Sequence, residues 1–238
     1  MNEKKTFTFD GTNSERFGLW ISGAGTLSNP VRDVEMVSVP GRNGDLEFFN
    51  GRYKNVTVMY QASGIITDFA AKYADFTSWA LGKIGYKRLE DDYHTDYYRM
   101  GRILLPSSPN MARNLKAGQI DISFDCKPQK FLKTGESVIT RTSSGKVTNP
   151  TIYNSKPLLK IYGTGKLTIG AYQIELTQNG TFTFVDCDNM NAYDNSSNMN
   201  RYLKVRDDLF PELIPGQNTV TLGTGITKVE ITPRWWTL

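Results

Sequence analysis

The feature that most constrains this chain is a succession of short stretches in which apolar and polar residues alternate, each closed by Gly, Asn or Pro. Successive side chains of a β-strand point to opposite faces, so this alternation predicts half-buried strands. Val56, Val58 and Tyr60 show it most clearly. Further candidate strands are 6–11, 17–23, 31–41, 97–105, 118–128, 156–163, 165–177, 180–188, 216–223 and 225–235. The chain is therefore expected to be mainly β.

One stretch, residues 66–85, has a different period. Its apolar side chains recur at helical spacing: Phe69, Tyr73, Phe76, Trp79 and Ala80. Thr67 or Asp68 is suited to cap the start of a helix, and Gly82 is suited to end it. A single amphipathic helix that packs on a sheet makes the N-terminal part α+β.

The length of 238 residues and a shift in composition favour two domains. Residues 134–150 are rich in Ser, Thr and Gly and poor in large apolar side chains, which suits either a linker or a sheet edge between domains. After them come only short strands at close spacing, the pattern of a small β-sandwich. We expect an N-terminal α+β domain over 1–135, a linker over 136–150 and a β-sandwich over 151–238.

The segment VPGRNGDLEFFNGRYK, residues 39–54, predicts two strands around a short loop, with tight turns at Pro40–Gly41, Asn43–Gly44 and Asn50–Gly51. Its adjacent phenylalanines supply more apolar area than one sheet face can bury. Such a hairpin is a candidate surface for contact between chains. The candidate interface residues are Arg42, Phe48, Phe49, Arg52 and Lys54. An ordinary intrachain hairpin is the alternative.

The chain ends in KVEITPRWWTL, with two adjacent tryptophans. Alternation places Trp235 on the face of Val229 and Ile231, toward the core of the sandwich, and Trp236 on the opposite face. Trp236 is therefore a further candidate for contact with another domain, the linker or another chain. Pro233 cannot donate to a strand ladder, so the strand lies at an edge, pairing stops there, or a bulge exchanges the two rings.

Charge and composition exclude several classes of protein. Formal net charge is +4, and the basic residues are scattered rather than gathered into an arm for nucleic acid. The N-terminus has no apolar export signal, and no segment is long and apolar enough to span a membrane, so we expect synthesis and folding in the cytoplasm. Cys126 and Cys187 have no partner spacing and are expected as buried free thiols.

Candidate catalytic and metal residues are few. His94 is the single histidine, and no nucleophile motif accompanies it, so we interpret it as a loop histidine among solvated carboxylates. The acidic run of Glu90, Asp91, Asp92 and Asp96 is in turn interpreted as a solvated face rather than a cation site. We therefore expect no catalytic site, no metal and no cofactor.

Sugar binding is the alternative function. Many β-sandwiches bind glycans through exposed aromatic rings that are flanked by polar side chains. Trp236, Tyr172 and Tyr202 are candidates for such a stacking surface. Core or interface packing is the favoured role for these rings, because aromatic residues are common at protein contacts.

Several stretches together resemble the distal tail protein, or Dit, family of long-tailed phages and prophages of Gram-positive bacteria. In the N-terminal half these are TFDGTNSERFGLWI, VPGRNGDL, YYRMGRI and ISFDCKPQKFL. In the C-terminal half they are TNPTIYNSKPLLKIYGTG, FVDCDNMNAY, LFPELIPGQNTV and ITKVEITPRWWTL. Their order along the chain follows that of the family.

This resemblance implies an N-terminal α+β ring-forming domain and a C-terminal galectin-like β-sandwich. It implies a non-enzymatic virion protein at the tail tip, a hexameric ring whose central channel lets DNA pass without specific binding. The implied partners are further copies of the chain, the major tail tube protein, a tail-associated or tail-tip protein, and a receptor-binding or baseplate protein. The chain has no room for the inserted carbohydrate-binding modules of some members, so it resembles the short, structural form.

Overall fold

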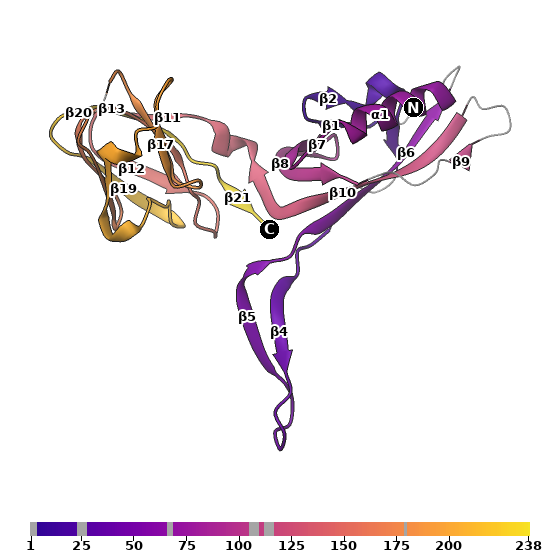
Figure 1. The fold of residues 1–238 in the computed structure, drawn as a ribbon, viewed down its shortest axis with the longest axis horizontal. Coiled ribbons are helices and arrows are strands. Elements are labelled where there is room, and N and C mark those ends of the chain that lie inside the picture. Colours follow the sequence, from indigo (N-terminus) through magenta and orange to yellow (C-terminus); the bar gives the residue numbers. More distant parts are fainter. Residues whose placement is uncertain (1–3, 23–27, 66–68, 105–109, 112–116, 179) are drawn as a thin grey trace. The chain divides into compact units, whose positions relative to one another are not determined.

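The structure is a computed structural model that describes residues 4–22, 28–65, 69–104, 110–111, 117–178 and 180–238. The chain divides into two compact units, residues 1–130 with Leu238, and residues 131–237. Figure 1 shows their strands and the helix. Within the described residues, no helix combines the length and the apolar character that a membrane crossing requires.

The N-terminal unit is built on an antiparallel sheet in the order β2-β1-β7-β8-β10-β6-β3, with β9 paired to β10. Its strands are β1 Phe7–Phe9, β2 Thr12–Asn13, β3 Trp20–Ser22, β6 Val56–Ile65, β7 Lys87–Asp91, β8 His94–Ile103, β9 Asn110–Met111 and β10 Ala117–Leu132. The longest pairing joins β6 to β10, from Val56 opposite Cys126 to Ile65 opposite Ala117. The period-2 stretch around Val56 and Tyr60 thus forms a strand, as predicted.

The helix α1, Phe69–Leu81, packs on this sheet (Figure 1). Phe69 and Phe76 are buried in a core with the inward side chains of β1, β6 and β10. A short 3-10 turn, η1 Ser14–Phe17, adds Phe17, whose ring centroid is 5.4 Å from that of Phe76. The predicted helix is confirmed, and its predicted caps at Thr67 and Asp68 lie outside the described residues.

A separate two-stranded hairpin, β4 Arg32–Val37 and β5 Leu46–Tyr53, belongs to the same unit. Each of the two strands pairs with the other and with no further described strand. Figure 1 shows the hairpin reaching away from the sheet. Two strands alone are at best marginally stable in water, so contacts outside the ladder have to stabilise this hairpin.

The second unit is a β-sandwich of two five-stranded antiparallel sheets, in the orders β11-β20-β13-β16-β17 and β12-β19-β14-β15-β18. Its strands are β11 Ile139–Arg141, β12 Gly145–Asn149, β13 Leu158–Gly163, β14 Gly165–Ile169, β15 Tyr172–Leu176, β16 Thr183–Asp186, β17 Asn191–Tyr193, β18 Leu203–Val205, β19 Gly216–Leu222, β20 Ile226–Thr232 and the short β21 Trp236–Thr237. Three more 3-10 turns are η2 Lys133–Glu136, η3 Asn200–Tyr202 and η4 Arg206–Asp208. Inward side chains such as Leu159, Val185 and Ile231 fill the space between the sheets.

The segment expected as a linker, 136–150, instead contains the strands β11 and β12. Each lies at the edge of one sheet of the sandwich. Of the two alternatives open for this composition, the structure has the sheet edge. An edge strand exposes one side of its ladder to water, and few large apolar residues are needed there, which is why the composition resembles that of a linker.

Glycine is required where β13 leads into β14, because the chain there lies close to the segment before β20. Gly163 adopts a φ of 90°, and a Cβ atom there would lie 2.0 Å from the carbonyl oxygen of Gly225. Gly225 also has a positive φ, 93°. Only glycine fits at either position, because a side chain would meet the facing main chain.

Candidate functional site

The predicted interface residues of the N-terminal unit lie on the hairpin. Phe49 pairs across the ladder with Val34, and Phe48 pairs with Glu35. Successive side chains of a strand point to opposite faces, so the two phenylalanines lie on opposite faces of the hairpin. Both faces therefore carry a large aromatic ring, where an ordinary half-buried hairpin has one apolar face.

The apolar side chains of the hairpin are exposed. Phe48 is 53% exposed and Phe49 is 50% exposed. Met36 and Val37 on the facing strand are exposed as well. The Phe49 ring contacts its own hairpin, with its centroid 6.2 Å from that of Tyr53 and 5.8 Å from the guanidinium of Arg32. Exposed apolar surfaces of this kind are typical of contact sites, and the interface role of these residues stays a prediction.

One buried carboxylate lies at the root of the hairpin, the end at which β4 begins and β5 ends. Asp33 is 8% exposed and accepts a hydrogen bond from Arg52 Nε at 2.7 Å. Lys54 Nζ lies 3.6 Å from its other oxygen. The hydrogen bond from Arg52 holds the pKa of the Asp33 carboxyl below its usual value, and the charges of Arg52 and Lys54 add to this effect. The structure thus brings together Arg52 and Lys54, which the sequence predicted only as charged interface residues.

The ladder shifts register at this root, between Arg32 and Val34. Asn50 and Gly51, predicted as a turn, lie inside β5 opposite this shift, and Gly51 has a φ of 71°. That prediction was wrong, because a glycine with positive φ serves a bulge as well as a turn. The bulge explains how Asp33 and Arg52 come to face each other.

At the tip, Arg42 lies at the end of a tight turn. Its N–H donates to the carbonyl of Val39 at 3.1 Å. Pro40 followed by Gly41 with a φ of 80° is the sequence pattern of a type II turn. The predicted turn is confirmed, and the Arg42 side chain is exposed. Arg42 is thus separated along the hairpin from the Asp33 cluster.

The two tryptophans lie in the sandwich unit, in different surroundings. Trp235 is 4% exposed and belongs to the core of the sandwich. Trp236 is half-buried, stacks on Tyr153 at a centroid distance of 4.4 Å, and donates from Nε1 to the carbonyl of Asn154 at 2.8 Å. The core position predicted for Trp235 is confirmed, and the interface role of Trp236 stays a prediction.

Strand β20 pairs with β11 on one side and β13 on the other, so it is not an edge strand. The strand ends at Thr232, directly before Pro233. Arg234 then adopts a φ of 57°, and the chain resumes as β21. Of the three alternatives open for Pro233, the structure has the one in which pairing stops.

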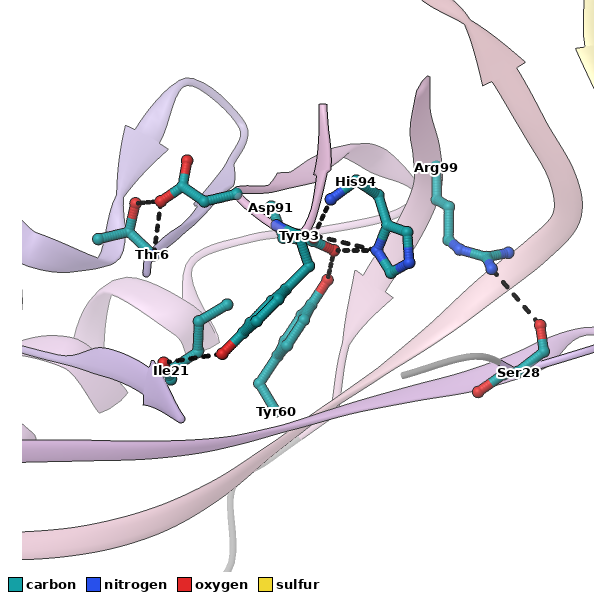
Figure 2. Close-up of polar contacts among 9 residues, drawn as sticks. Thr6, Ile21, Ser28, Tyr60, Asp91, Tyr93, His94 and Arg99 are labelled. Carbon is teal, nitrogen blue, oxygen red and sulfur yellow. Dashed lines mark hydrogen bonds and ion pairs between the residues drawn. The ribbon is translucent and has the colours of Figure 1, made fainter. Parts of the chain in front are cut away.

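His94, the single catalytic candidate, belongs to a polar cluster in the N-terminal unit (Figure 2). It is the first residue of β8, after a two-residue turn from β7. Its Nδ1 lies 3.1 Å from Oδ1 of Asp91, and Tyr60 donates to Oδ2 of the same carboxylate at 2.6 Å. The main-chain N–H groups of Tyr93 and His94 also donate to Oδ1. The prediction was a loop histidine among solvated carboxylates. Instead, Asp91 ends β7 and His94 begins β8, because the strand alternation continues through the acidic residues of β7.

The hydrogen bonds of this cluster stabilise the turn between β7 and β8. Asp91 has both oxygens engaged, so neither is directed at an open space. Burial raises the pKa of Tyr60 well above its usual value, and the charge of Asp91 and the hydrogen bond to it add to this effect. No group of three or more His, Cys, Asp or Glu side chains in the described residues is arranged to hold a metal ion.

The cysteines and the remaining aromatic candidates are also placed. Cys126 and Cys187 are buried and free, as predicted, and burial raises the pKa of both thiols, that of Cys126 to about 12. Tyr172 and Tyr202 are half-buried in the sandwich. The Tyr172 hydroxyl donates to Glu212 at 3.5 Å.

A row of aromatic side chains on the sandwich was not predicted from the sequence. Phe182, Phe184 and Tyr193 follow one another at centroid distances of 5.2 and 5.3 Å, on the side of the sheet opposite the core. Lys160 Nζ lies 4.1 Å from the Phe182 centroid. The alternation in GTFTFVDCD contains Phe182 and Phe184, but Tyr193 joins them only through the pairing of β16 with β17.

The chain is similar to known proteins in its structure rather than in its sequence. No family model matches the chain, and no curated protein does. The Dit protein of phage SPP1, described as a paradigm of the hub adsorption apparatus in phages that infect Gram-positive bacteria, matches with a TM-score of 0.75. The two are 11% identical, and the match covers 99% of this chain and 100% of that chain.

Two baseplate structures of phage P2, in the activated conformation, also match. The one with calcium has a TM-score of 0.51 and 9% identity and covers 97% of this chain and 98% of that one. The one with strontium has a TM-score of 0.52 and 10% identity, with 96% and 97% covered. The chain therefore has the fold of a phage distal tail protein over its whole length. The predicted mainly β fold with one helix is confirmed.

Proposed function

We propose that this chain is a distal tail protein, a structural and non-enzymatic component of the tail of a phage or prophage. The observation that carries the proposal is the match to the SPP1 Dit protein, which covers 99% of one chain and 100% of the other. A match of both units in one order is stronger support than a match of either alone, because small β-sandwiches occur in many unrelated proteins.

In the proposed assembly, six copies form a ring at the tail tip. The ring joins the tail tube protein to a tail-associated or tail-tip protein and to receptor-binding or baseplate proteins, and DNA passes through its channel. Synthesis and assembly take place in the bacterial host. A rotational ring requires two complementary surfaces on each chain. The hairpin supplies one of them in this proposal, through Phe48, Phe49 and Arg42, and Trp236 is a candidate contact on the sandwich.

The hairpin is suited to this role by two of its features. Both of its faces carry exposed apolar side chains, and both of its strands have an edge that pairs with no described strand. A second chain can therefore cover its rings and extend its ladder. The Asp33, Arg52 and Lys54 cluster holds the root in a fixed conformation, which lowers the entropy lost on binding.

The test is the mass of the purified full chain by light scattering, with negative-stain images of the same fraction. We expect a ring with six times the monomer mass of 26.8 kDa. If the chain remains monomeric at high concentration, the tail tube protein is added before the measurement is repeated. A chain that assembles in neither condition contradicts the proposed function.

Glycan binding is a second candidate function, and the aromatic row of the sandwich favours it. Phe182, Phe184 and Tyr193 form a continuous surface, with the charged Lys160 and Glu230 beside it. Aromatic faces with adjacent polar groups are typical of sugar sites. Sedimentation of the full chain with purified host cell walls tests this function. Retention of wild type and loss of retention in Phe184→Ala would support it, and equal sedimentation of both would contradict it.

A further inference from the structure

Arg99, on β8, is a buried cation that lacks an ion-pair partner. Its side chain is 5% exposed, and its Nη1 has no hydrogen-bond partner. Nη2 lies 3.5 Å from the carbonyl oxygen of Ser28, at the limit of a hydrogen bond (Figure 2). Among the described residues, no carboxylate forms an ion pair with this guanidinium. A guanidinium remains charged in proteins, so the site holds a positive charge that the chain itself does not pair.

Asp91, the carboxylate at the centre of Figure 2, already has several partners. Asp91 accepts from the Tyr60 hydroxyl and from two main-chain N–H groups, and its Oδ1 also faces His94 Nδ1 (Figure 2). Among the described residues, Arg99 forms no hydrogen bond and no ion pair with this carboxylate.

A second cation increases the positive charge. Lys130 Nζ lies 5.6 Å from the ring centroid of Tyr97, and the guanidinium of Arg99 lies 5.7 Å from the same centroid. Burial lowers the pKa of Lys130, and the charge of Arg99 lowers it further. Lys130 Nζ donates to the main-chain oxygen of Leu238 at 3.1 Å. Two cations thus flank one partly exposed tyrosine.

A buried charge without a nearby opposite charge destabilises the fold. Proteins keep such a charge where a partner supplies the opposite one. We propose that Arg99, with Lys130 beside it, binds an oxyanion that comes from outside this chain. A planar guanidinium is suited to a carboxylate or phosphate, which it holds through two parallel hydrogen bonds. Nη1 is buried, so an anion reaches it only after a neighbouring side chain has moved.

Two sources supply an oxyanion that a guanidinium binds in the same way. One is a carboxylate side chain of the neighbouring chain in the ring, and this source rests on the proposed function. The other is dissolved phosphate, which does not. Ser28 lies just before the hairpin, whose first strand begins at Arg32. Arg99 therefore lies near a residue that directly precedes the surface proposed to meet the next chain.

The experiment compares Arg99→Met with wild type and with Arg102→Met, all as the full chain in chloride buffer. Arg102 lies on the same strand, is exposed, and donates to Asp125 at 2.8 Å, so it controls for the loss of one arginine. Thermal unfolding of the monomer at low concentration is the first measurement. We expect an unchanged or higher midpoint for Arg99→Met, because an unpaired buried charge is removed.

The second measurement separates the sources. If the anion is dissolved phosphate, adding inorganic phosphate raises the unfolding midpoint of wild type and of Arg102→Met but not of Arg99→Met. If it belongs to the neighbouring chain, Arg99→Met raises the concentration needed for assembly at least tenfold, while Arg102→Met leaves it within twofold.

Two results overturn the inference. One is a monomer midpoint that falls by several degrees in Arg99→Met, which means that the charge is satisfied within the chain. The other is identical behaviour of wild type and Arg99→Met in both phosphate and assembly. If wild type never assembles, the proposed ring fails, and the phosphate titration still decides the inference.

Discussion

Arg234 holds the carboxylate of Asp186 with two hydrogen bonds, from Nη1 at 2.7 Å and from Nη2 at 3.1 Å. Asp186 ends β16 and is 5% exposed, and Arg234 lies in the break between β20 and β21. The main-chain N–H of Arg234 also donates to the carbonyl of Gly135 at 2.8 Å. This one residue thus ties the end of the chain to two separate segments of the sandwich.

Replacing Arg234 by Met is expected to destabilise the sandwich by about 2 to 3 kcal/mol, because Asp186 would remain as a buried carboxylate without its cation. The exposed pair of Arg206 and Asp207 provides the control, since Arg206→Met is expected to cost less than about 0.5 kcal/mol. Hydrogen exchange of β16 and β20 peptides, followed against denaturant in the full chain, measures both. Equal effects of the two variants would contradict the role given to Arg234.

The same pair predicts a dependence of stability on pH. Burial alone would raise the pKa of Asp186, but the hydrogen bonds from Arg234 and Asn189 outweigh it and lower the pKa to about 2. A carboxyl whose pKa is lower in the folded state stabilises the fold above its unfolded pKa and loses this contribution as pH falls through the folded value.

The stability of the sandwich is therefore expected to fall by about 2 kcal/mol between about pH 4 and pH 2 from this group. In Arg234→Met this part of the decrease should be much smaller. Denaturant unfolding at a series of pH values, for both proteins, measures the difference. Parallel curves for the two proteins would show that Asp186 is not the group responsible.

The sequence predicts the secondary structure of this chain better than it predicts the contacts of individual side chains. Alternation and helical spacing depend on local sequence alone, and they correctly predicted the strand at Val56 and the helix at Phe69. The contacts of a polar side chain depend on which strand lies opposite it in the folded sheet. Asp33 and Arg52 meet because of a bulge, and nothing in the local pattern distinguishes Gly51 in a bulge from Gly51 in a turn.

The candidate sites show the same division. The sequence predicted that the hairpin residues are candidates for contact, because two adjacent phenylalanines exceed what one face can bury. It did not predict Arg99, because an arginine within an alternating strand usually lies on the solvent face. The contact that the structure gives it, to the carbonyl oxygen of Ser28, comes from a segment that is distant in sequence.

The hairpin gives a prediction that separates assembly from folding. Phe48→Ser combined with Phe49→Ser is expected to leave the unfolding midpoint of the monomer within about 1 °C, since both rings are half exposed, and to weaken assembly at least tenfold. Met59→Ser, at 46% exposure on β6, is the matched control and should assemble normally. Mass photometry across a dilution series measures the assembly. Normal assembly of the double variant would exclude the hairpin as the contact.

The two tryptophans give the last prediction, because adjacent residues of one type differ here only in surroundings. Trp235→Ala removes a ring from the core of the sandwich and is expected to cost about 3 to 5 kcal/mol. Trp236→Ala removes a stack on Tyr153 and a hydrogen bond to Asn154, which together contribute about 1 to 2 kcal/mol.

Hydrogen exchange of the sandwich peptides should therefore rank the two variants, with Trp235→Ala exchanging far faster. Trp236→Phe serves as a control for the hydrogen bond, since it keeps an aromatic ring and loses the Nε1 donor. If Trp236→Ala also weakens assembly while Trp236→Phe does not, the ring of Trp236 is part of a contact between chains. If Trp236→Ala destabilises the sandwich as much as Trp235→Ala, the distinction between core and surface tryptophan drawn from the structure is wrong.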